Sequence, residues 1–275
     1  MSWAYNQIDV YISTQDNILG ETSVNTNSWV PLSIYGILRG RPVLTPSTVE
    51  GDKVTITGRD GRSVSTISSR ANAKLEFEIL AVDAWPFATL KAQGITVRKR
   101  IDILKALLNN TVRITYKEPG RDPDSFFIVY STTLTLTDAD EKAQSIKVSM
   151  ELHPFEYWFS GNTQITVAAS GSYTFTNQLP DAECYPIYQI PADVSGQPNI
   201  TVNNNVLAYT PNTVITTGLI TIDTFDQLAY YSPSVNPNRY FNGSYDKLTF
   251  PVGSNVVHNN TNKAIYIYTR KGMTL

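Results

Sequence analysis

Alternation of apolar and polar side chains runs through most of this chain, and it constrains the fold more than any other feature. In the stretch 7–13, Ile8, Val10 and Ile12 alternate with polar neighbours, and 74–80 repeats the pattern. A period of two residues gives a strand one apolar face and one polar face, so these segments are expected to be half-buried strands. The same pattern continues at 113–117, 126–136 and 145–152. We therefore expect a mainly β protein.

One segment, 97–110, departs from the alternation and predicts an amphipathic helix. Its apolar side chains recur every three or four residues, which places them on one helical face. These are Ile101, Leu104, Leu107 and Leu108, and Asn109–Asn110 then end the helix near residue 110. The basic run Arg98-Lys99-Arg100 falls at other angles, so we expect it on the solvated face. A shorter helix or loop is expected within 84–93, with Asp83 as its cap.

Charge divides the chain into two parts. Residues 1–160 hold 17 of the 22 Lys and Arg and 18 of the 24 Asp and Glu, which leaves 5 and 6 for the remainder. We expect two domains, 1–160 and 161–275, joined by a connector at 157–164 where an aromatic cluster gives way to Ser-Gly-Asn. The second domain carries strand patterns at short, regular intervals, which are typical of an antiparallel sandwich or jelly roll. They lie at 163–169, 172–177, 185–190, 199–204, 212–218, 219–224, 227–232, 245–250 and 263–270.

Composition argues against several classes of protein. The net charge of −2 offers no broad positive field for nucleic acid. One cysteine, Cys184, forms no intramolecular disulfide and is expected to be buried and inert. The first residues lack the pattern of a signal peptide and no long apolar run is present, so no membrane association is expected. Asn242-Gly243-Ser244 is one of three glycosylation sequons, to which we therefore assign no role.

The side chains that enzymes use are scattered. His153 and His258 lie far apart in sequence, and His153 is expected to pack among aromatic residues rather than act as a base. The acidic run Asp138, Asp140 and Glu141 lies between two strand patterns and predicts a solvated hairpin turn, with a weak calcium site as the alternative. We assign no catalytic, cofactor-binding or metal-binding residue and expect no cofactor.

The cluster at 58–62, Gly-Arg-Asp-Gly-Arg, resembles a phosphate loop only superficially. A phosphate loop ends in Gly-Lys-Ser/Thr and opens a helix, whereas here a Ser/Thr-rich stretch leads into the strand at 74–80. Asp60-Gly61 is a typical tight-turn pair, so a hairpin is predicted. Arg59, Asp60 and Arg62 at its tip carry both signs of charge and are our candidates for contacts between subunits.

Several stretches of the chain resemble the distal tail proteins of bacteriophages with long, flexible, non-contractile tails. In the first half these are the strand and turn at 35–46, the hairpin at 49–63, the strand at 74–83 and the helix before 112–116. In the second half they are 199–211, 216–231, 245–257 and 263–275, where Pro251, Gly253 and Asn255 form a turn before a late strand. Each motif is a turn signature of moderate specificity, but together they follow the family's order of elements along nearly the whole chain.

The resemblance implies a fold and a role. An N-terminal β-sandwich or barrel-like domain with one helix would form a hexameric ring, and a galectin-like sandwich would follow it. The ring would sit at the virion's tail tip, between the tail tube protein, the tail-associated lysin and the receptor-binding proteins. DNA and the tape-measure protein would pass through without specific binding. The implied protein is structural and not an enzyme.

Two other functions stay open at this point. A carbohydrate-binding or receptor-binding module also uses a β-sandwich, but Trp3, Trp29, Trp85 and Trp158 all precede the second domain. Sugar-binding galectins stack the sugar on a tryptophan, so tyrosines such as Tyr266 would have to serve here. A glycan-degrading enzyme is the third alternative, and the scattered carboxylates argue against it.

Overall fold

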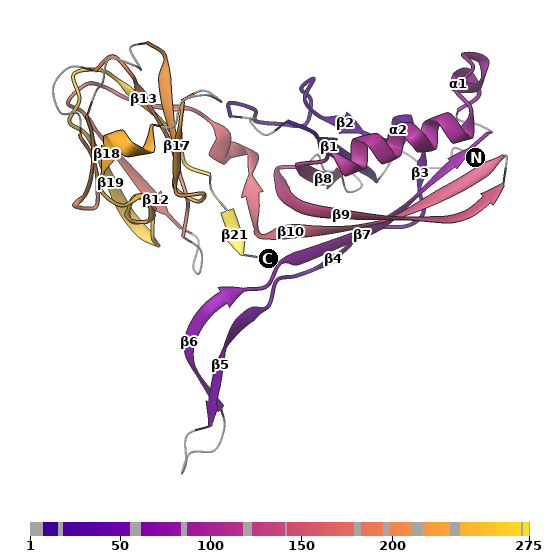
Figure 1. Cartoon of the computed structure of the whole chain (residues 1–275), viewed down its shortest axis with the longest axis horizontal. Coiled ribbons are helices and arrows are strands. Elements are labelled where there is room, and N and C mark those ends of the chain that lie inside the picture. Colours follow the sequence, from indigo (N-terminus) through magenta and orange to yellow (C-terminus); the bar gives the residue numbers. More distant parts are fainter. Residues whose placement is uncertain are drawn as a thin grey trace. The chain divides into compact units, whose positions relative to one another are not determined.

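The computed structural model describes residues 8–15, 19–55, 62–83, 87–117, 123–140, 142–178, 183–194, 199–210, 217–231, 237–270 and 272–274. The chain is mainly β, as predicted, with two α-helices among the described residues. It divides into two compact units (Figure 1). The first unit comprises 1–18, 23–156 and 274–275, and the second comprises 19–22 and 157–273.

The first unit is built on one large antiparallel sheet. Its strands have the order β2-β1-β8-β9-β10-β7-β3, and β4 also pairs with β7. The strands are β1 (Asp9–Ser13), β2 (Val30–Pro31), β3 (Ile37–Leu38), β4 (Val43–Thr45), β7 (Ala73–Val82), β8 (Arg113–Lys117), β9 (Ser125–Asp140) and β10 (Ala143–Trp158). A 3-10 helix, η1 (Leu32–Ile34), follows β2. The five alternating strand patterns of the first 152 residues are thus confirmed as β1, β7, β8, β9 and β10.

Helix α2 (Val97–Asn109) covers one face of the large sheet (Figure 1). Thr96 caps its N-terminus, with its hydroxyl accepting a bond from the Lys99 amide at 3.3 Å, and the Asn110 side chain donates to the Ala106 carbonyl at 2.8 Å. Leu104 and Leu108 are fully buried in the core against apolar residues of β7 and β10. The predicted helix is therefore confirmed at both ends and on its apolar face.

The prediction that Arg100 lies on the solvated face is wrong. Its side chain is fully buried and donates to the carbonyl oxygens of Val82 and Tyr35. The guanidinium lies 4.6 Å from the centre of the Phe87 ring, a favourable cation–π arrangement. Burial lowers the pKa of Arg100, an effect that Asp83 opposes. Arg100 is buried because of its position in the helix. It is three residues from Val97 and four from Leu104, which places it on the helical face that packs on the sheet.

The short helix α1 (Ala88–Ala92) is present, but Asp83 does not cap it. Phe87 occupies the N-cap position without a side-chain hydrogen bond. The Asp83 carboxylate instead accepts a bond from the Lys91 ammonium at 2.5 Å. Asp83 is too far before the first turn to reach its free amides, which a capping side chain must do.

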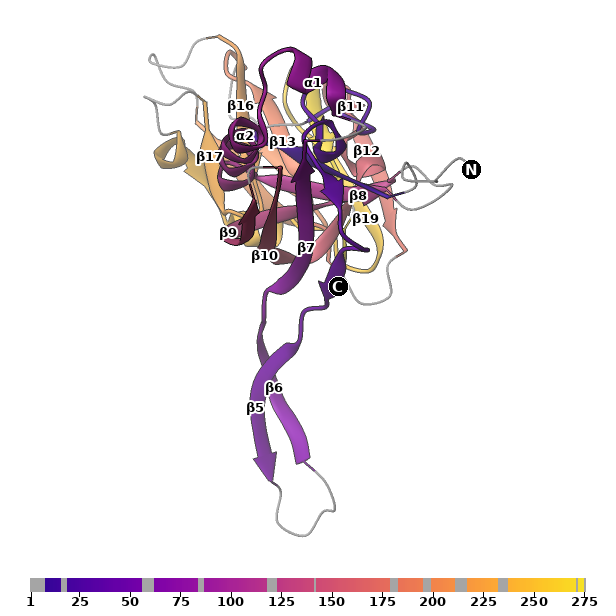
Figure 2. The ribbon, with the colours of Figure 1, turned by 90° about the vertical axis from the view of Figure 1, so that its right-hand side faces the viewer.

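Between β4 and β7, the chain forms the hairpin of β5 (Val49–Thr55) and β6 (Arg62–Arg70). The two strands form a two-stranded sheet of their own (Figure 2). Their register pairs Val49 with Arg70 and Thr55 with Arg62, with irregularities around Gly51. This pairing confirms that the chain forms a hairpin here, and the tight turn predicted at Asp60-Gly61 lies outside the described residues.

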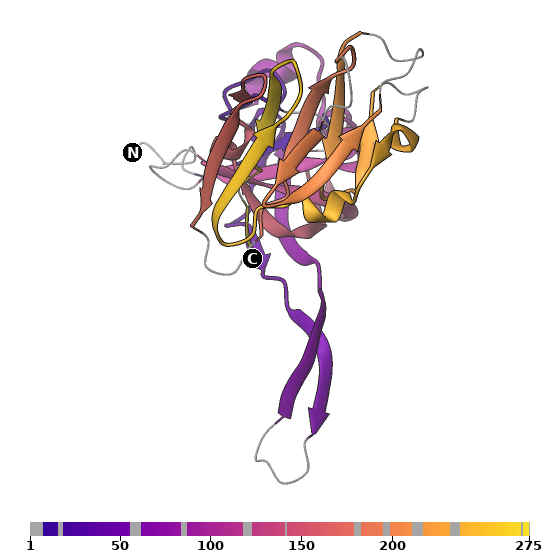
Figure 3. The same cartoon turned by 90° about the vertical axis from the view of Figure 1, so that its left-hand side faces the viewer.

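The second unit is a sandwich of two five-stranded sheets, counted over its described residues. One has the order β11-β20-β13-β16-β17, and the other has the order β12-β19-β14-β15-β18, onto which Figure 3 looks. The strands are β11 (Ile165–Val167), β12 (Ser172–Asn177), β13 (Ile187–Pro191), β14 (Asn199–Val202), β15 (Asn205–Tyr209), β16 (Leu219–Asp223), β17 (Leu228–Tyr230), β18 (Phe241–Asn242), β19 (Gly253–Asn259) and β20 (Ile265–Tyr268). A last strand, β21 (Gly272–Thr274), ends the chain.

Apolar side chains from both sheets fill the space between them. Tyr188, Ile222 and Ile267 from one sheet and Val257 from the other are completely buried. Asn203 and Asn204, at φ of 48° and 73°, form the tight turn between β14 and β15, because asparagine tolerates positive φ better than most residues. The antiparallel sandwich expected for this part is therefore present.

One strand prediction for the second unit is wrong, and another lies mostly outside the described residues. The predicted strand at 245–250 is instead η4 (Tyr245–Lys247), a 3-10 helix, followed by a single bridge between Phe250 and Cys184. Leu248 and Phe250 enter the core from this irregular segment, which explains the misleading apolar spacing. Most of the predicted strand at 212–218 lies outside the described residues. A further 3-10 helix, η3 (Asn238–Tyr240), precedes β18.

The expected connector at 157–164 contains several buried residues. Tyr157 is the residue before the last in β10. A 3-10 helix, η2 (Phe159–Asn162), follows directly. Tyr157, Phe159 and Asn162 are each at most 3 % exposed. The Gly20 amide donates to the Asn162 carbonyl at 2.9 Å. The aromatic residues favour burial, which outweighs the turn tendency of Ser-Gly-Asn.

Candidate interaction surfaces

The predicted subunit contacts, Arg59, Asp60 and Arg62, belong to the β5–β6 hairpin. Arg59 and Asp60 lie outside the described residues, and Arg62 is the first residue of β6, opposite Thr55. Their role in contacts between subunits stays a prediction. The sequence did not identify the other charged surfaces of the chain, which follow from the order of the strands.

A groove of about 410 Å³ lies on the face of the large sheet that α2 leaves free. Alternation along β7 and β10 places polar side chains on this face, while Leu75, Ile79 and Ile146 face the core. β9 adds hydroxyl groups, and the segment before β4 adds two arginines. The groove is lined by Arg39, Arg41, Val43, Glu76, Phe77, Glu78, Thr133, Thr135, Lys147, Val148 and Ser149.

Charges of both signs lie side by side in this groove. Arg39 and Glu78 form an ion pair at 3.0 Å, and the register places Lys147 opposite Glu78. A hydrogen bond from Ser145, with help from Arg39 and Lys147, lowers the pKa of Glu78 although desolvation opposes the shift. Lys74 and Glu76 form a second pair at 2.8 Å on the same face. The face therefore offers donors and acceptors without a strong net charge.

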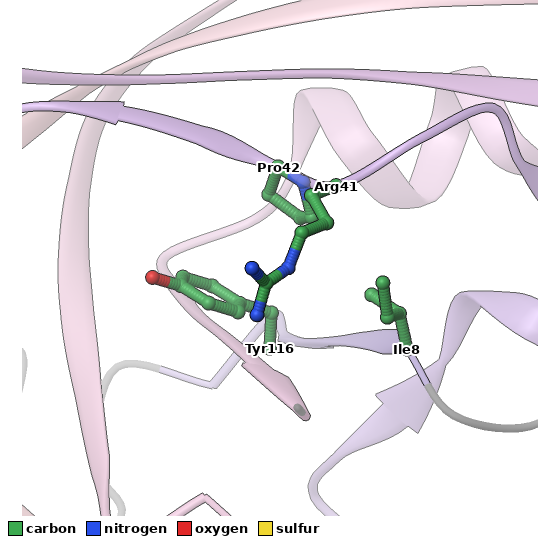
Figure 4. Close-up of a pocket in the computed structure, with 4 residues that line it drawn as sticks. All are labelled: Ile8, Arg41, Pro42 and Tyr116. Atoms are coloured by element: carbon green, nitrogen blue, oxygen red, sulfur yellow. The ribbon is translucent and has the colours of Figure 1, made fainter. Parts of the chain in front are cut away.

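Arg41 also lines a smaller cavity of about 130 Å³. Figure 4 shows its guanidinium beside the Tyr116 ring, with Ile8 and Pro42 completing the wall. Ile8 precedes β1 and Tyr116 lies on β8, whereas Pro42 precedes β4, which pairs with the other end of the sheet. The large sheet is therefore curled so that its two sides approach each other at Arg41, consistent with the expected barrel-like form.

The histidines and the cysteine that the sequence brought up as chemical candidates do not meet. His153 is 1 % exposed, with its ring 5.4 Å from that of Tyr130 and 5.1 Å from that of Phe155, so its predicted packing role is confirmed. His258 lies in β19 on the exposed side, and Cys184 is buried as expected. Among the residues that the structure describes, no three His, Cys, Asp or Glu side chains converge on a possible metal position.

The acidic run leaves its predictions partly open. β9 ends at Asp140 and β10 begins at Ala143, so the predicted hairpin turn is confirmed for the backbone. Glu141 lies outside the described residues, and the alternative of a calcium site stays a prediction. In the described part of the chain, neither helix is long and apolar enough to cross a bilayer.

A row of polar and aromatic side chains crosses the outer face of one sheet of the second unit. The register aligns Tyr266 on β20, Gln189 on β13, Thr221 on β16 and Tyr230 on β17. Tyr230 is 44 % exposed, and Leu228 beside it is 50 % exposed. The Gln189 amide nitrogen lies 3.4 Å from the Thr221 hydroxyl. These four residues are far apart in sequence, and the order of the strands brings them together.

The chain is similar in fold to a phage protein among the solved structures. No protein-family model matches the chain, and no curated protein matches it. SPP1 Dit (gp 19.1), described as a paradigm of the hub adsorption apparatus in phages that infect Gram-positive bacteria, matches with a TM-score of 0.54 at 12% identity. The match covers 94% of this chain and 97% of that chain. The fold expected from the family resemblance is thereby confirmed.

Two structures of the phage P2 baseplate in its activated conformation also match. The one with Ca has a TM-score of 0.49 and 9% identity and covers 96% of this chain and 98% of that chain. The one with Sr has a TM-score of 0.49 and 10% identity and covers 94% of this chain and 97% of that chain.

Proposed function

We propose that this protein is a structural component of a phage tail tip, a hub that connects the tail tube to the host-adhesion device. The observation that carries the proposal is the fold shared with SPP1 Dit over 94% of the chain. Fold alone does not define function, but here sequence motifs in both halves point to the same family. The protein acts through its contacts with other proteins and not through catalysis.

In this proposal the first unit forms a homo-hexameric ring. DNA and the tape-measure protein pass through its centre, and the major tail tube protein and the tail-associated lysin bind on either side. The second unit holds the receptor-binding proteins. In a cyclic ring one surface of each copy contacts a different surface of the next, so each charged group needs a partner elsewhere on the same chain. The mixed charges of the groove around Arg39 and Glu78 suit such an interface.

Native mass spectrometry of the full chain tests the ring directly. We expect a species of six subunits, and negative-stain images should show a central hole. The double variant Arg59→Glu, Arg62→Glu should reduce the ring to smaller species, because charge reversal places like charges against each other. The matched control is Arg98→Glu, Lys99→Glu, which reverses two exposed charges at the start of α2 and should leave the ring intact.

Each result has a definite meaning. A wild-type protein that stays monomeric at micromolar concentration, without a hole in images, contradicts the ring. A ring that survives the hairpin variant unchanged rejects the role of Arg59 and Arg62 but leaves the hub in place. A ring that both double variants break equally shows a general sensitivity to charge and not a contact at the hairpin.

One observation favours a second function, saccharide binding by the second unit. The row Tyr266, Gln189, Thr221 and Tyr230 combines two aromatic rings with an amide and a hydroxyl group. Tyrosine offers an apolar face and a polar tip, as sugar recognition requires. Calorimetric titration with host cell-wall saccharides should then show heat of binding. The variant Tyr230→Ala should abolish this heat, and the control Tyr173→Ala, on the other sheet, should leave it unchanged. No heat from the wild-type protein would leave the outer face as a protein-docking surface only.

A further inference from the structure

One asparagine of this chain combines a reactive sequence with an exposed position. Asn242 is the only asparagine that a glycine follows. Its side chain is exposed, and no hydrogen bond to it is seen among the residues that the structure describes. We propose that Asn242 is a site of spontaneous deamidation, a covalent modification that converts it to aspartate and isoaspartate in the folded protein. This proposal does not depend on the proposed function.

The chemistry needs only the chain and water. The deprotonated main-chain nitrogen of Gly243 attacks the side-chain carbonyl carbon of Asn242, a C–N bond forms and ammonia leaves. The resulting five-membered succinimide is then opened by water at either carbonyl. Opening at the main-chain carbonyl gives isoaspartate, and opening at the side-chain carbonyl gives aspartate. Overall, one amide and one water become one carboxylic acid and one ammonia, with no change in oxidation state.

Gly243 favours this attack because it lacks a Cβ. Its nitrogen approaches the neighbouring carbonyl with little steric hindrance, and its main chain reaches conformations closed to other residues. Gly243 has a φ of 131°, a value that L side chains rarely adopt. The other exposed asparagines with described surroundings, such as Asn204 and Asn260, precede asparagine and threonine, which carry side chains.

The position of Asn242 in the fold allows the main-chain movement that the reaction requires. It belongs to β18, a strand of two residues at the edge of its sheet, whose one partner among the described strands is β15. Asn242 lies opposite Ala208, and Phe241 lies opposite Tyr209. The main chain must rotate at Asn242 for the attack, and so short an edge strand opens locally at low cost. Central strands of the same sandwich would require far more of the unit to unfold.

The isoaspartate product does not fit the native arrangement. It adds one methylene group to the main chain directly before Gly243. A Cβ built on Gly243 would lie 2.5 Å from the Val206 carbonyl oxygen and 3.0 Å from Leu207 Cδ1, so this position has no spare room. Formation of isoaspartate should therefore separate β18 from β15. It should also loosen Phe241 from the Tyr209 ring, whose centre lies 5.0 Å away.

Peptide mapping by mass spectrometry tests the proposal on the full-length folded protein. The protein is aged at physiological temperature in mildly alkaline buffer, and the modified fraction at Asn242 is followed against Asn204 and Asn260. We expect Asn242 to react roughly tenfold or more faster, the ratio given by a barrier lower by about 1.4 kcal/mol. A methyltransferase specific for isoaspartate should label the same peptide.

Asn242→Gln is the matched control, because glutamine would have to form a slower six-membered ring. It should abolish the labelling while leaving the rest of the map unchanged. Equal rates at Asn242, Asn204 and Asn260, or persistent labelling in Asn242→Gln, would overturn the proposal. So would rapid modification in urea with none in buffer, since the fold would then protect the site. Aged wild-type protein should also lose hydrogen-exchange protection in 205–209, and Asn242→Gln should keep it.

Discussion

Both units bury the apolar face of a sheet, but different elements cover that face in the two units. In the first unit the helix α2 covers the large sheet, and the opposite face keeps its charges in exposed pairs such as Arg39–Glu78. In the second unit a sheet covers a sheet, and its few charges include the nearly buried pair of Arg270 and Asp223 at 2.9 Å. The free face of the large sheet thus carries exposed ion pairs, whereas the second unit also contains an ion pair that is nearly buried.

In the second unit, buried asparagine side chains donate hydrogen bonds to main-chain carbonyl groups. The fully buried Asn259 side chain donates to the carbonyl oxygens of Val167, Ala168 and Lys263. Asn255, also fully buried, donates to those of Pro251 and Gly253. These bonds satisfy main-chain carbonyl groups at strand ends and in the segments that adjoin them. A neutral amide does so without the desolvation cost of a buried charge.

The largest effect should come from the core beneath α2. Leu104→Ala removes a fully buried side chain and should lower the free energy of unfolding by about 3 to 5 kcal/mol. Asp102→Ala, at an exposed position of the same helix, should change it by less than about 0.5 kcal/mol. Denaturant unfolding followed by hydrogen exchange measures both. Loss of protection confined to the first unit supports two separate cores, and equal loss in both units would contradict them.

The next effect should come from the buried ion pair of the second unit. Arg270→Met leaves the Asp223 carboxylate without its charged partner, although the Phe225 and Asp226 amides still donate to it. Breaking a buried pair costs about 3 to 5 kcal/mol, and the retained amide bonds should reduce the loss to about 2 to 3 kcal/mol. Chemical denaturation of the intact protein measures the loss.

Lys263→Met gives the matched comparison, because Lys263 pairs with Asp193 at the surface, with side-chain exposures of 41% and 47%. The loss of stability in this variant should be much smaller, because water screens an exposed ion pair. Equal losses in the two variants would show that burial does not distinguish the two pairs. The contrast between a surface use and an interior use of charge would then fail.

The smallest effect should be a dependence on pH in the second unit. Partial desolvation of its carboxylate, together with the nearby Asp223, raises the pKa of Asp226 from its ordinary value of 3.8, and Arg270 opposes the shift. A raised carboxyl pKa destabilises the folded state above that pKa, and the penalty disappears as pH falls below 3.8. Asp226→Asn should therefore raise the melting temperature slightly at pH 7, and the gain should vanish at about pH 3. An equal gain at both pH values would exclude the charge as the cause.

Prediction from the sequence succeeded where one local pattern decided the outcome. Helix α2 and strands such as β7 and β12 follow from the spacing of apolar residues, because burial of one face dictates that spacing. It failed at Arg100, whose residue type suggested exposure while its position demanded burial. It failed again at 245–250, where Leu248 and Phe250 are buried from an irregular segment.

The candidate surfaces were less predictable than the elements that form them. Arg62 could be placed in a hairpin from its neighbours alone. The groove around Glu78 and Lys147 needed the pairing of β7 with β10, and the row from Tyr266 to Tyr230 needed the order of four strands. These partners are far apart in sequence, and a register shift of one residue would move each side chain to the other face.

The sequence by itself determined the mainly β character of this protein, its single long helix, a hairpin at 49–63 and the contrast in charge between its halves. These features depend on residues that are neighbours along the chain. The tertiary structure decided that Arg100 is buried, that Arg270 meets Asp223 and that Asn242 lies on an edge strand beside a crowded glycine. Such features depend on which strands pair, and that pairing is fixed only when the whole core is packed.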